Sequence, residues 1–218
     1  MLKIKNLGYW YDRPEEALFN DVNLEFRTGQ SYAVIGQSGT GKTTFLSLIA
    51  GLDVPKKGSI ELDGRDVRQI GLANFRKRDV SIVFQAYNLV TYMSSLDNVL
   101  TAMAITDSSH KGDKGFAKTL LGKLGLTGTQ IMQKVSHLSG GQQQRVAIAR
   151  AMAVDANLVV ADEPTGNLDE TNTREVVALF QRLAHEQQKC VIIITHEPEV
   201  AQACDHQIQL AGHQFNLV

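Results

Sequence analysis

The chain has 218 residues, 43% of them hydrophobic, which suits one substantial domain with a buried core. Its 22 basic and 23 acidic side chains give a formal net charge of −1, which argues against a general nucleic-acid binder. The two cysteines, Cys190 and Cys204, have no third ligand nearby for a metal site, and no apolar run is long enough to cross a bilayer.

The first third of the chain predicts an antiparallel sheet. Apolar and polar side chains alternate over residues 2–7, 22–26 and 60–62, as in strands with one buried face. Turn-forming residues separate these segments, at 12–14 and at 63–64.

Four short apolar runs predict a second, mostly parallel sheet, because strands covered on both faces lose the alternation. They are residues 32–35, 81–84, 158–161 and 191–194. Helical spacing of apolar residues over Thr43–Ala50 and Thr173–Ala184 alternates with these runs. Strands that alternate with helices indicate an α/β core.

Residues 88–154 interrupt this rhythm. They contain no convincing buried strand, and helical patterns cover Leu96–Ala104, Phe116–Leu124 and Gln142–Ala153. We therefore expect a helical subdomain inserted into the sheet domain.

Residues 36–43 fit the pattern G-x-x-x-x-G-K-[ST] of a phosphate-binding P-loop. The alternative is an accidental glycine-rich turn, but a predicted buried strand precedes the motif and a predicted helix follows it. Glycines let backbone N–H groups approach phosphates, and a helix N-terminus attracts anions. We expect Lys42 to reach the β- and γ-phosphates and Thr43 to ligate Mg²⁺. The predicted nucleotide-binding residues here are Gly36, Gln37, Ser38, Gly39, Thr40, Gly41, Lys42, Thr43 and Thr44.

Polar side chains follow three of the predicted parallel strands, at the edge where open α/β sheets bind ligands. Asp162 and Glu163 end one strand, and we expect Asp162 to bind Mg²⁺ and Glu163 to act as general base on the attacking water. His196 is placed to contact the γ-phosphate or the water, and Gln85 to complete the Mg²⁺ or water shell. Each has a plainer alternative, a solvated loop residue for Glu163 and Gln85 and a structural role for His196.

The segment 138–142, Leu-Ser-Gly-Gly-Gln, predicts a helix start with a capping box, in which Ser139 is the N-cap and Gln142 occupies the third helical position. The capping box leaves Gly140 and Gly141 unexplained, because each glycine in a first helical turn costs up to ~1 kcal/mol relative to alanine. Close approach of a second phosphate to the backbone would explain both glycines.

Together these motifs resemble the ATP-binding cassette (ABC) ATPases, over nearly the whole chain and in the family's order. By this resemblance, residues 36–43 are the Walker A loop, 158–162 the Walker B strand, 138–142 the signature and 166–169 the D-loop. The resemblance implies ATP and Mg²⁺ as cofactors, with catalytic roles for Glu163, His196, Gln85 and Lys42 and metal contacts from Thr43, Gln85 and Asp162.

The family also implies further nucleotide contacts. Tyr11 is placed as the aromatic residue that stacks on adenine, with Tyr9 and Trp10 as alternatives. Asp169 belongs to the D-loop. The family's two-fold, head-to-tail homodimer holds two ATP molecules, and the γ-phosphate at each partner's Walker A loop is gripped by Ser139, Gly140, Gly141 and Gln142.

The resemblance implies a RecA-like P-loop fold, a mostly parallel α/β core sheet with an N-terminal antiparallel β subdomain and an inserted helical subdomain. We expect a single ATP-binding domain over 1–218, with the nucleotide-binding core and β subdomain in 1–87 and 155–218 and the helical subdomain in 88–154.

Residues 161–169 resemble the cassettes of lipoprotein-release, macrolide-efflux, antimicrobial-peptide-resistance and cell-division systems, whereas residues 101–118 depart from that subgroup. The resemblance implies an ATPase subunit at the cytoplasmic face of the membrane, powering separate permease subunits that export or extract a lipophilic or peptide substrate. The alternative is a soluble ABC ATPase without a transport role, in iron–sulfur assembly or on DNA or ribosomes.

Overall fold

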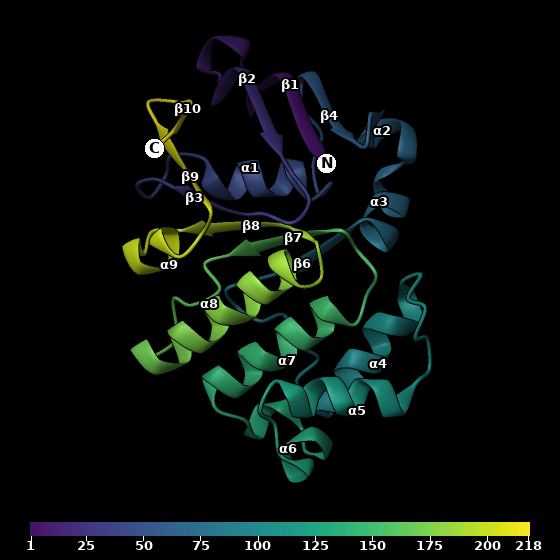
Figure 1. The fold of residues 1–218 in the computed structure, drawn as a ribbon. Coiled ribbons are helices and arrows are strands. Elements are labelled where there is room, and N and C mark those ends of the chain that lie inside the picture. The colour runs from purple at the N-terminus through teal and green to yellow at the C-terminus, as the bar shows by residue number, and fades with distance from the viewer.

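The computed structural model describes residues 1–218, which fold into two sheets with helices between and below them (Figure 1). One sheet is antiparallel and has the strand order β2 (Phe19–Phe26), β1 (Leu2–Tyr9), β4 (Lys57–Leu62) and β5 (Arg65–Asp66). The alternation in the sequence predicted its three long strands. In the central strand, Ile4 pairs with Leu24 on one side and Ile60 on the other, so the apolar residues meet on one face.

The second sheet is the predicted parallel core, with one antiparallel strand at its edge. Its order is β10 (Gln214–Leu217), β9 (His206–Ala211), β3 (Ser31–Ile35), β8 (Cys190–Thr195), β7 (Leu158–Asp162) and β6 (Val80–Val83). All neighbours run parallel except the β9–β10 pair. The carboxyl ends of β3, β7 and β8 therefore meet at one edge of the sheet.

Helix α1 (Lys42–Ile49) lies between the two sheets and joins them into one core (Figure 1). A cluster of 26 buried side chains combines residues of both sheets with Phe45, Leu46 and Ile49 of this helix. The other face of the parallel sheet is covered by α7 (Gly140–Met152) and α8 (Glu170–His185), within a second cluster of 29 buried side chains.

The remaining helices form two groups. One group lies beside and below α7 in Figure 1 and comprises α4 (Ser95–Ile105), α5 (Lys114–Lys123) and α6 (Gly128–Met132). The 3-10 turn η2 (Val135–His137) follows α6 in the chain. Around the sheets lie η1 (Pro14–Glu16), α2 (Val67–Ile70), α3 (Leu72–Arg78) and α9 (Pro198–Gln202). No helix combines the length and the apolar character that a membrane span requires.

The expected insertion is visible in the strand pairing. The chain leaves the core sheet after β6 and returns to it at β7, and these two strands are direct neighbours, with Val80 opposite Leu158. The helices α4 to α7 are built from the intervening residues. The architecture confirms the predicted α/β class, while the exact subdomain boundaries at 88 and 154 remain a prediction.

Candidate active site

The glycine-rich loop joins the end of β3 to the start of α1, as its sequence predicted. Its backbone geometry requires glycine at two positions. A Cβ atom on Gly36 would lie 2.6 Å from the carbonyl oxygen of Leu210, and one on Gly41 would lie 2.9 Å from Leu18. Gly41 also has a φ of +100°, a backbone conformation that residues with a Cβ atom rarely adopt. The loop is therefore held in one shape by its surroundings.

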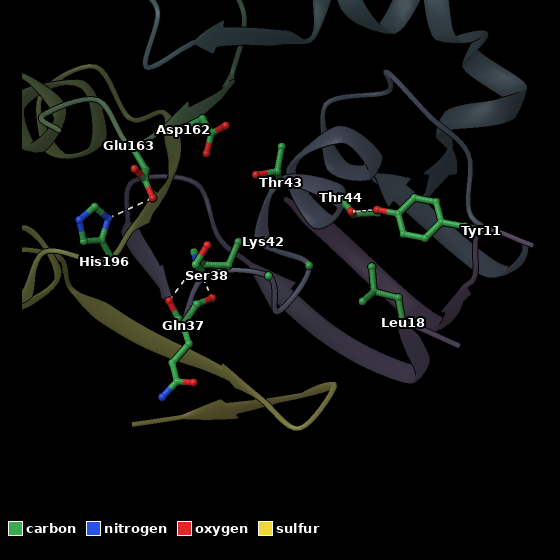
Figure 2. Close-up of a pocket in the computed structure, with 13 residues that line it drawn as sticks. Tyr11, Leu18, Gln37, Ser38, Lys42, Thr43, Thr44, Asp162, Glu163 and His196 are labelled. Atoms are coloured by element: carbon green, nitrogen blue, oxygen red, sulfur yellow. Dashed lines mark hydrogen bonds and ion pairs between the residues drawn. The ribbon is translucent and has the colours of Figure 1, made fainter. Parts of the chain in front are cut away.

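A cavity of about 570 Å³ opens along this loop and is of the size that small-molecule ligands occupy (Figure 2). Three parts of the chain that are distant in sequence line it, the segment before β2, the glycine-rich loop with α1, and the ends of β7 and β8. The lining residues are Tyr11, Leu18, Gly36, Gln37, Ser38, Gly39, Gly41, Lys42, Thr43, Thr44, Asp162, Glu163 and His196.

The side chain of Lys42 is held by hydrogen bonds to the backbone of its own loop. Its Nζ donates hydrogen bonds to the carbonyl oxygens of Gly36 and Gln37, each at 2.8 Å, and the residue is only 8% exposed. An ammonium group beside backbone N–H groups and a helix N-terminus forms an electropositive binding site for phosphate oxygens.

Asp162 is the last residue of β7 and faces the same cavity. Burial raises the pKa of its carboxyl group, the neighbouring charge of Glu163 raises it further, and Lys42 opposes the rise. A cation beside Asp162 would offset the free-energy cost of burying its negative charge. The carboxylate of Asp162 and the hydroxyl of Thr43 are hard oxygen donors, which fits Mg²⁺, an ion that proteins hold with one or two carboxylates plus substrate phosphates.

Glu163 and His196 form a hydrogen-bonded pair at the cavity wall, with 3.0 Å between Oε1 of Glu163 and Nδ1 of His196 (Figure 2). Glu163 has a left-handed backbone, with a φ of +42°, and its N–H donates to the carbonyl oxygen of Ile194 at the end of β8. Such a conformation costs about 1–3 kcal/mol in a residue other than glycine and persists where the surroundings fix it. The backbone thus holds the Glu163 carboxylate at the cavity.

Of the three candidate aromatic residues, only Tyr11 lines the cavity. Its side chain is 63% exposed, and its hydroxyl hydrogen-bonds that of Thr44. Tyr9 is buried and donates to Oδ2 of Asp53 at 2.6 Å, a hydrogen bond that, with burial, raises the pKa of Tyr9 to about 12. Leu18 also lines the cavity and was missed by the sequence reasoning; its only signal there was its place next to the predicted strand 22–26.

Several predicted site residues lie outside this cavity. The signature residues Ser139 and Gln142 form the predicted capping box of α7, with Ser139 N–H donating to Oε1 of Gln142 at 3.0 Å and Gln142 N–H to Oγ of Ser139 at 3.4 Å. Asp169 caps the N-terminus of α8 through the N–H of Asn172. Gln85 points toward Gly166, where an added Cβ would lie 3.2 Å from its Nε2 atom.

The comparisons with known proteins agree with this geometry. Residues 19–166, more than half of the chain, match the sequence family described as ABC transporter. The uncharacterized ABC transporter ATP-binding protein YclH of Bacillus subtilis is 52% identical over 100% of this chain and 96% of its own length. The lipoprotein-releasing system ATP-binding protein LolD of Chromohalobacter salexigens is 38% identical over 96% of this chain and 90% of its own length.

A similar solved structure adds the nucleotide state. The ATP-binding cassette MJ0796, in a dimeric post-hydrolysis state bound to ADP and phosphate, superposes with a TM-score of 0.87 and 32% identity, covering 99% of this chain and 97% of the other. The resemblance to lipoprotein-release cassettes that the sequence predicted is confirmed by the LolD match. The chain therefore belongs to the ABC transporter family, as an ATP-binding cassette with ATPase function.

Proposed function

We propose that two copies of this chain close head-to-tail around two ATP molecules and drive a membrane permease. One observation carries the proposal. The signature Ser139–Gln142 opens α7 with two glycines, yet none of its residues lines the cavity that contains the P-loop. A phosphate-binding motif that lies outside the nucleotide cavity of its own chain is explained if it binds the partner's nucleotide. The similar cassette MJ0796 is dimeric, as this explanation requires.

In the proposed complex, the ring of Tyr11 stacks on adenine and Leu18 supplies an apolar wall beside it. The backbone of 36–41 and the Lys42 ammonium bind the phosphates, with Thr40 completing the loop and Thr44 adding its hydroxyl. Lys42 exchanges its two carbonyl partners for β- and γ-phosphate oxygens. The hydroxyl of Thr43 and the carboxylate of Asp162 would hold Mg²⁺, and the bound ion would offset the negative charge of the phosphates.

Hydrolysis is assigned to Glu163 and His196. The Glu163 carboxylate accepts a proton from water as the water oxygen attacks the γ-phosphorus and the bond from that phosphorus to the ADP oxygen breaks. His196 holds the Glu163 carboxylate in place through their hydrogen bond. Gln85 and Asp169 lie outside the cavity, so we assign them roles in the closed dimer, Gln85 toward the metal or the water and Asp169 toward the partner.

The permease contact is proposed at a groove of about 390 Å³ between β6 and α4, half of whose lining residues are hydrophobic. Val90 and Ile105 line it, and the Ile105 side chain is 68% exposed. A short helix of the permease, docked there, would receive the motion of the helical subdomain. By similarity to LolD, we propose a lipophilic or peptide substrate, exported or extracted, and a place at the cytoplasmic face of the membrane.

The dimer is tested with Ser139→Arg in a Glu163→Gln background, in which slow hydrolysis preserves bound ATP. The arginine fills the signature without touching the P-loop cavity of its own chain. We expect ATP affinity of the monomer to stay within about twofold of the background and ATP-driven dimerisation on size-exclusion chromatography to be lost. Loss of monomer affinity, or dimerisation equal to that of the background, would contradict the sandwich.

A further inference from the structure

An arginine near the end of α7 holds the loop that follows β6. The guanidinium of Arg150 donates from Nη1 to the carbonyl oxygen of Asn88 at 2.5 Å and from Nη2 to that of Tyr87 at 2.9 Å. Both acceptor residues have a left-handed backbone conformation, with φ of +59° at Tyr87 and +47° at Asn88. Consecutive left-handed residues other than glycine are unfavourable and persist where neighbouring groups hold them. The Arg150 guanidinium is such a neighbour.

The partners of Arg150 are unusual for a cation. Its side chain is half-buried and bonds to backbone carbonyls, and burial lowers its pKa. Removing a guanidinium from water is unfavourable unless its donors are paired in a fixed geometry. The two hydrogen bonds from Arg150 meet this condition, because they join its guanidinium to two consecutive carbonyl oxygens of the loop.

The side chain of Tyr87 reaches the opposite end of the same helix. A Cβ atom on Gly140, the first residue of α7, would lie 3.1 Å from the Tyr87 hydroxyl oxygen. Gly140 precedes Arg150 by ten residues, or about 15 Å along a helix axis. The side chains of Arg150 and Tyr87 together therefore connect the two ends of α7, with the Tyr87 backbone held by Arg150 and its hydroxyl against the signature glycine.

The same loop also contacts the segment after β7. The side chain of Asn167 donates to the carbonyl oxygen of Gln85 at 3.4 Å. Burial raises the pKa of Tyr87, and a contact with the Asn167 side chain opposes that rise. One loop of four residues, 85–88, thus touches the start of α7, the end of α7 and the turn between β7 and α8.

We propose that Arg150 is a positioning residue that fixes the loop 85–88 to helix α7, so that Gln85 and the signature move as one unit. Under the proposed function, on which this inference rests, Gln85 belongs to the ATP site of its own chain and the signature to that of the partner. The Arg150–Tyr87–Gly140 connection then transmits the position of Gln85 to the signature within one chain. Without it, the loop relaxes, and α7 presents Ser139 and its glycines in the wrong place.

The test compares Arg150→Met, which keeps an unbranched aliphatic stem and removes the donors, with Arg150→Lys, which keeps a positive donor, in the Glu163→Gln background. Arg182→Met, at an exposed arginine of α8, is the matched control. For Arg150→Met we expect monomer ATP affinity within about twofold of the background and ATP-driven dimerisation weaker by roughly tenfold to a hundredfold, because small misplacements have effects of that size. Arg150→Lys recovers part of the loss, and Arg182→Met behaves as the background.

Tyr87→Phe provides a second measurement, because it leaves the ring and removes only the hydroxyl that meets Gly140. We expect the same separation of unchanged monomer affinity from weakened dimerisation. Dimerisation of Arg150→Met equal to the background overturns the inference. So does an equal loss of monomer affinity and dimerisation that lysine fails to relieve, since that pattern indicates general destabilisation. Ser139→Arg separates the two proposals: if it dimerises, the sandwich fails, and if only Arg150→Met dimerises, this inference fails.

Discussion

Nδ1 of His196 lies 3.0 Å from Oε1 of Glu163, and the two residues follow the adjacent parallel strands β8 and β7. The left-handed backbone of Glu163 places its carboxylate at the cavity wall next to this imidazole. Neighbouring strand ends thus supply a carboxylate and a group that orients it, opposite the lysine of the P-loop. This geometry supports the proposal that Glu163, oriented by His196, activates the attacking water.

The first prediction concerns Glu163→Gln. The amide keeps the size and the left-handed position of the side chain but cannot accept a proton from water, so we expect kcat for ATP hydrolysis to fall by about 10²–10⁴ while ATP binding is retained. Phosphate release and equilibrium nucleotide binding measure the two effects. Glu186→Gln, at an exposed glutamate, should match the wild type. Wild-type turnover by the Glu163 variant would remove Glu163 from the proposed role.

The second prediction separates the aromatic residues. Tyr11→Ala removes the exposed ring at the cavity, and stacking of a base on an aromatic ring contributes about 1–3 kcal/mol, so ATP affinity should fall by that amount. Trp10→Ala, which changes a ring that does not line the cavity, is the control and should bind ATP as the wild type does. Titration with a fluorescent ATP analogue measures both. Equal losses would mean that the nucleotide contacts the segment differently.

The third prediction concerns the thiols. Burial raises the pKa of Cys190 and of Cys204 to about 12, and the charge of Asp205 adds to the rise at Cys204. Since the thiolate is the reactive form, both should resist iodoacetamide in the native protein near pH 8 and react in urea. Mass spectrometry of intact protein counts the adducts. An adduct on native protein within the time that labels the denatured chain would show that a thiol is more accessible than its surroundings indicate.

The fourth prediction concerns stability against acid. Burial raises the pKa of Asp205, but hydrogen bonds from the N–H and hydroxyl of Ser31 and contact with His185 outweigh it, so the pKa is lowered overall. A carboxyl with a depressed pKa stabilises the fold above its unfolded value of about 3.9, and the contribution is lost as pH falls through the folded value.

Asp205→Asn should therefore lower the free energy of unfolding by about 1–2 kcal/mol at neutral pH, with the difference from wild type shrinking below about pH 4. Urea titrations across that range measure it. Asp21→Asn, at an exposed aspartate, should unfold as the wild type does at every pH. A difference independent of pH would assign the effect to shape and not to the charge of Asp205.

The sequence predicted those parts of the site whose chemistry is local. The P-loop pattern of 36–43 needs only a strand before it and a helix after it, and both were visible as short apolar and periodic segments. The capping box at Ser139 was equally local. The fold class followed from the difference between alternating and continuous apolar strands.

The rest depended on contacts between distant segments. Leu18 lines the cavity because the chain at the start of β2 packs against Gly41, and its place next to the predicted strand 22–26 does not reveal that contact. Tyr9 and Tyr11 have the same side chain, but Tyr9 ends β1, packs in the core and donates to Asp53, whereas Tyr11 lies beyond the strand and is exposed. Strands β9 and β10 were missed because glutamines and asparagine interrupt their apolar pattern.

The pairing of β6 with β7 has a consequence for how such a chain can diversify. The backbone leaves the core sheet after β6 and returns at the neighbouring strand β7, so the two ends of the helical segment lie close together. Lengthening, shortening or replacing α4 and α5 changes no register in the core sheet. Changes in residues 101–118, which belong to this helical segment, therefore leave the strand pairing of the nucleotide-binding core intact, so the same ATPase core can be combined with different helical segments.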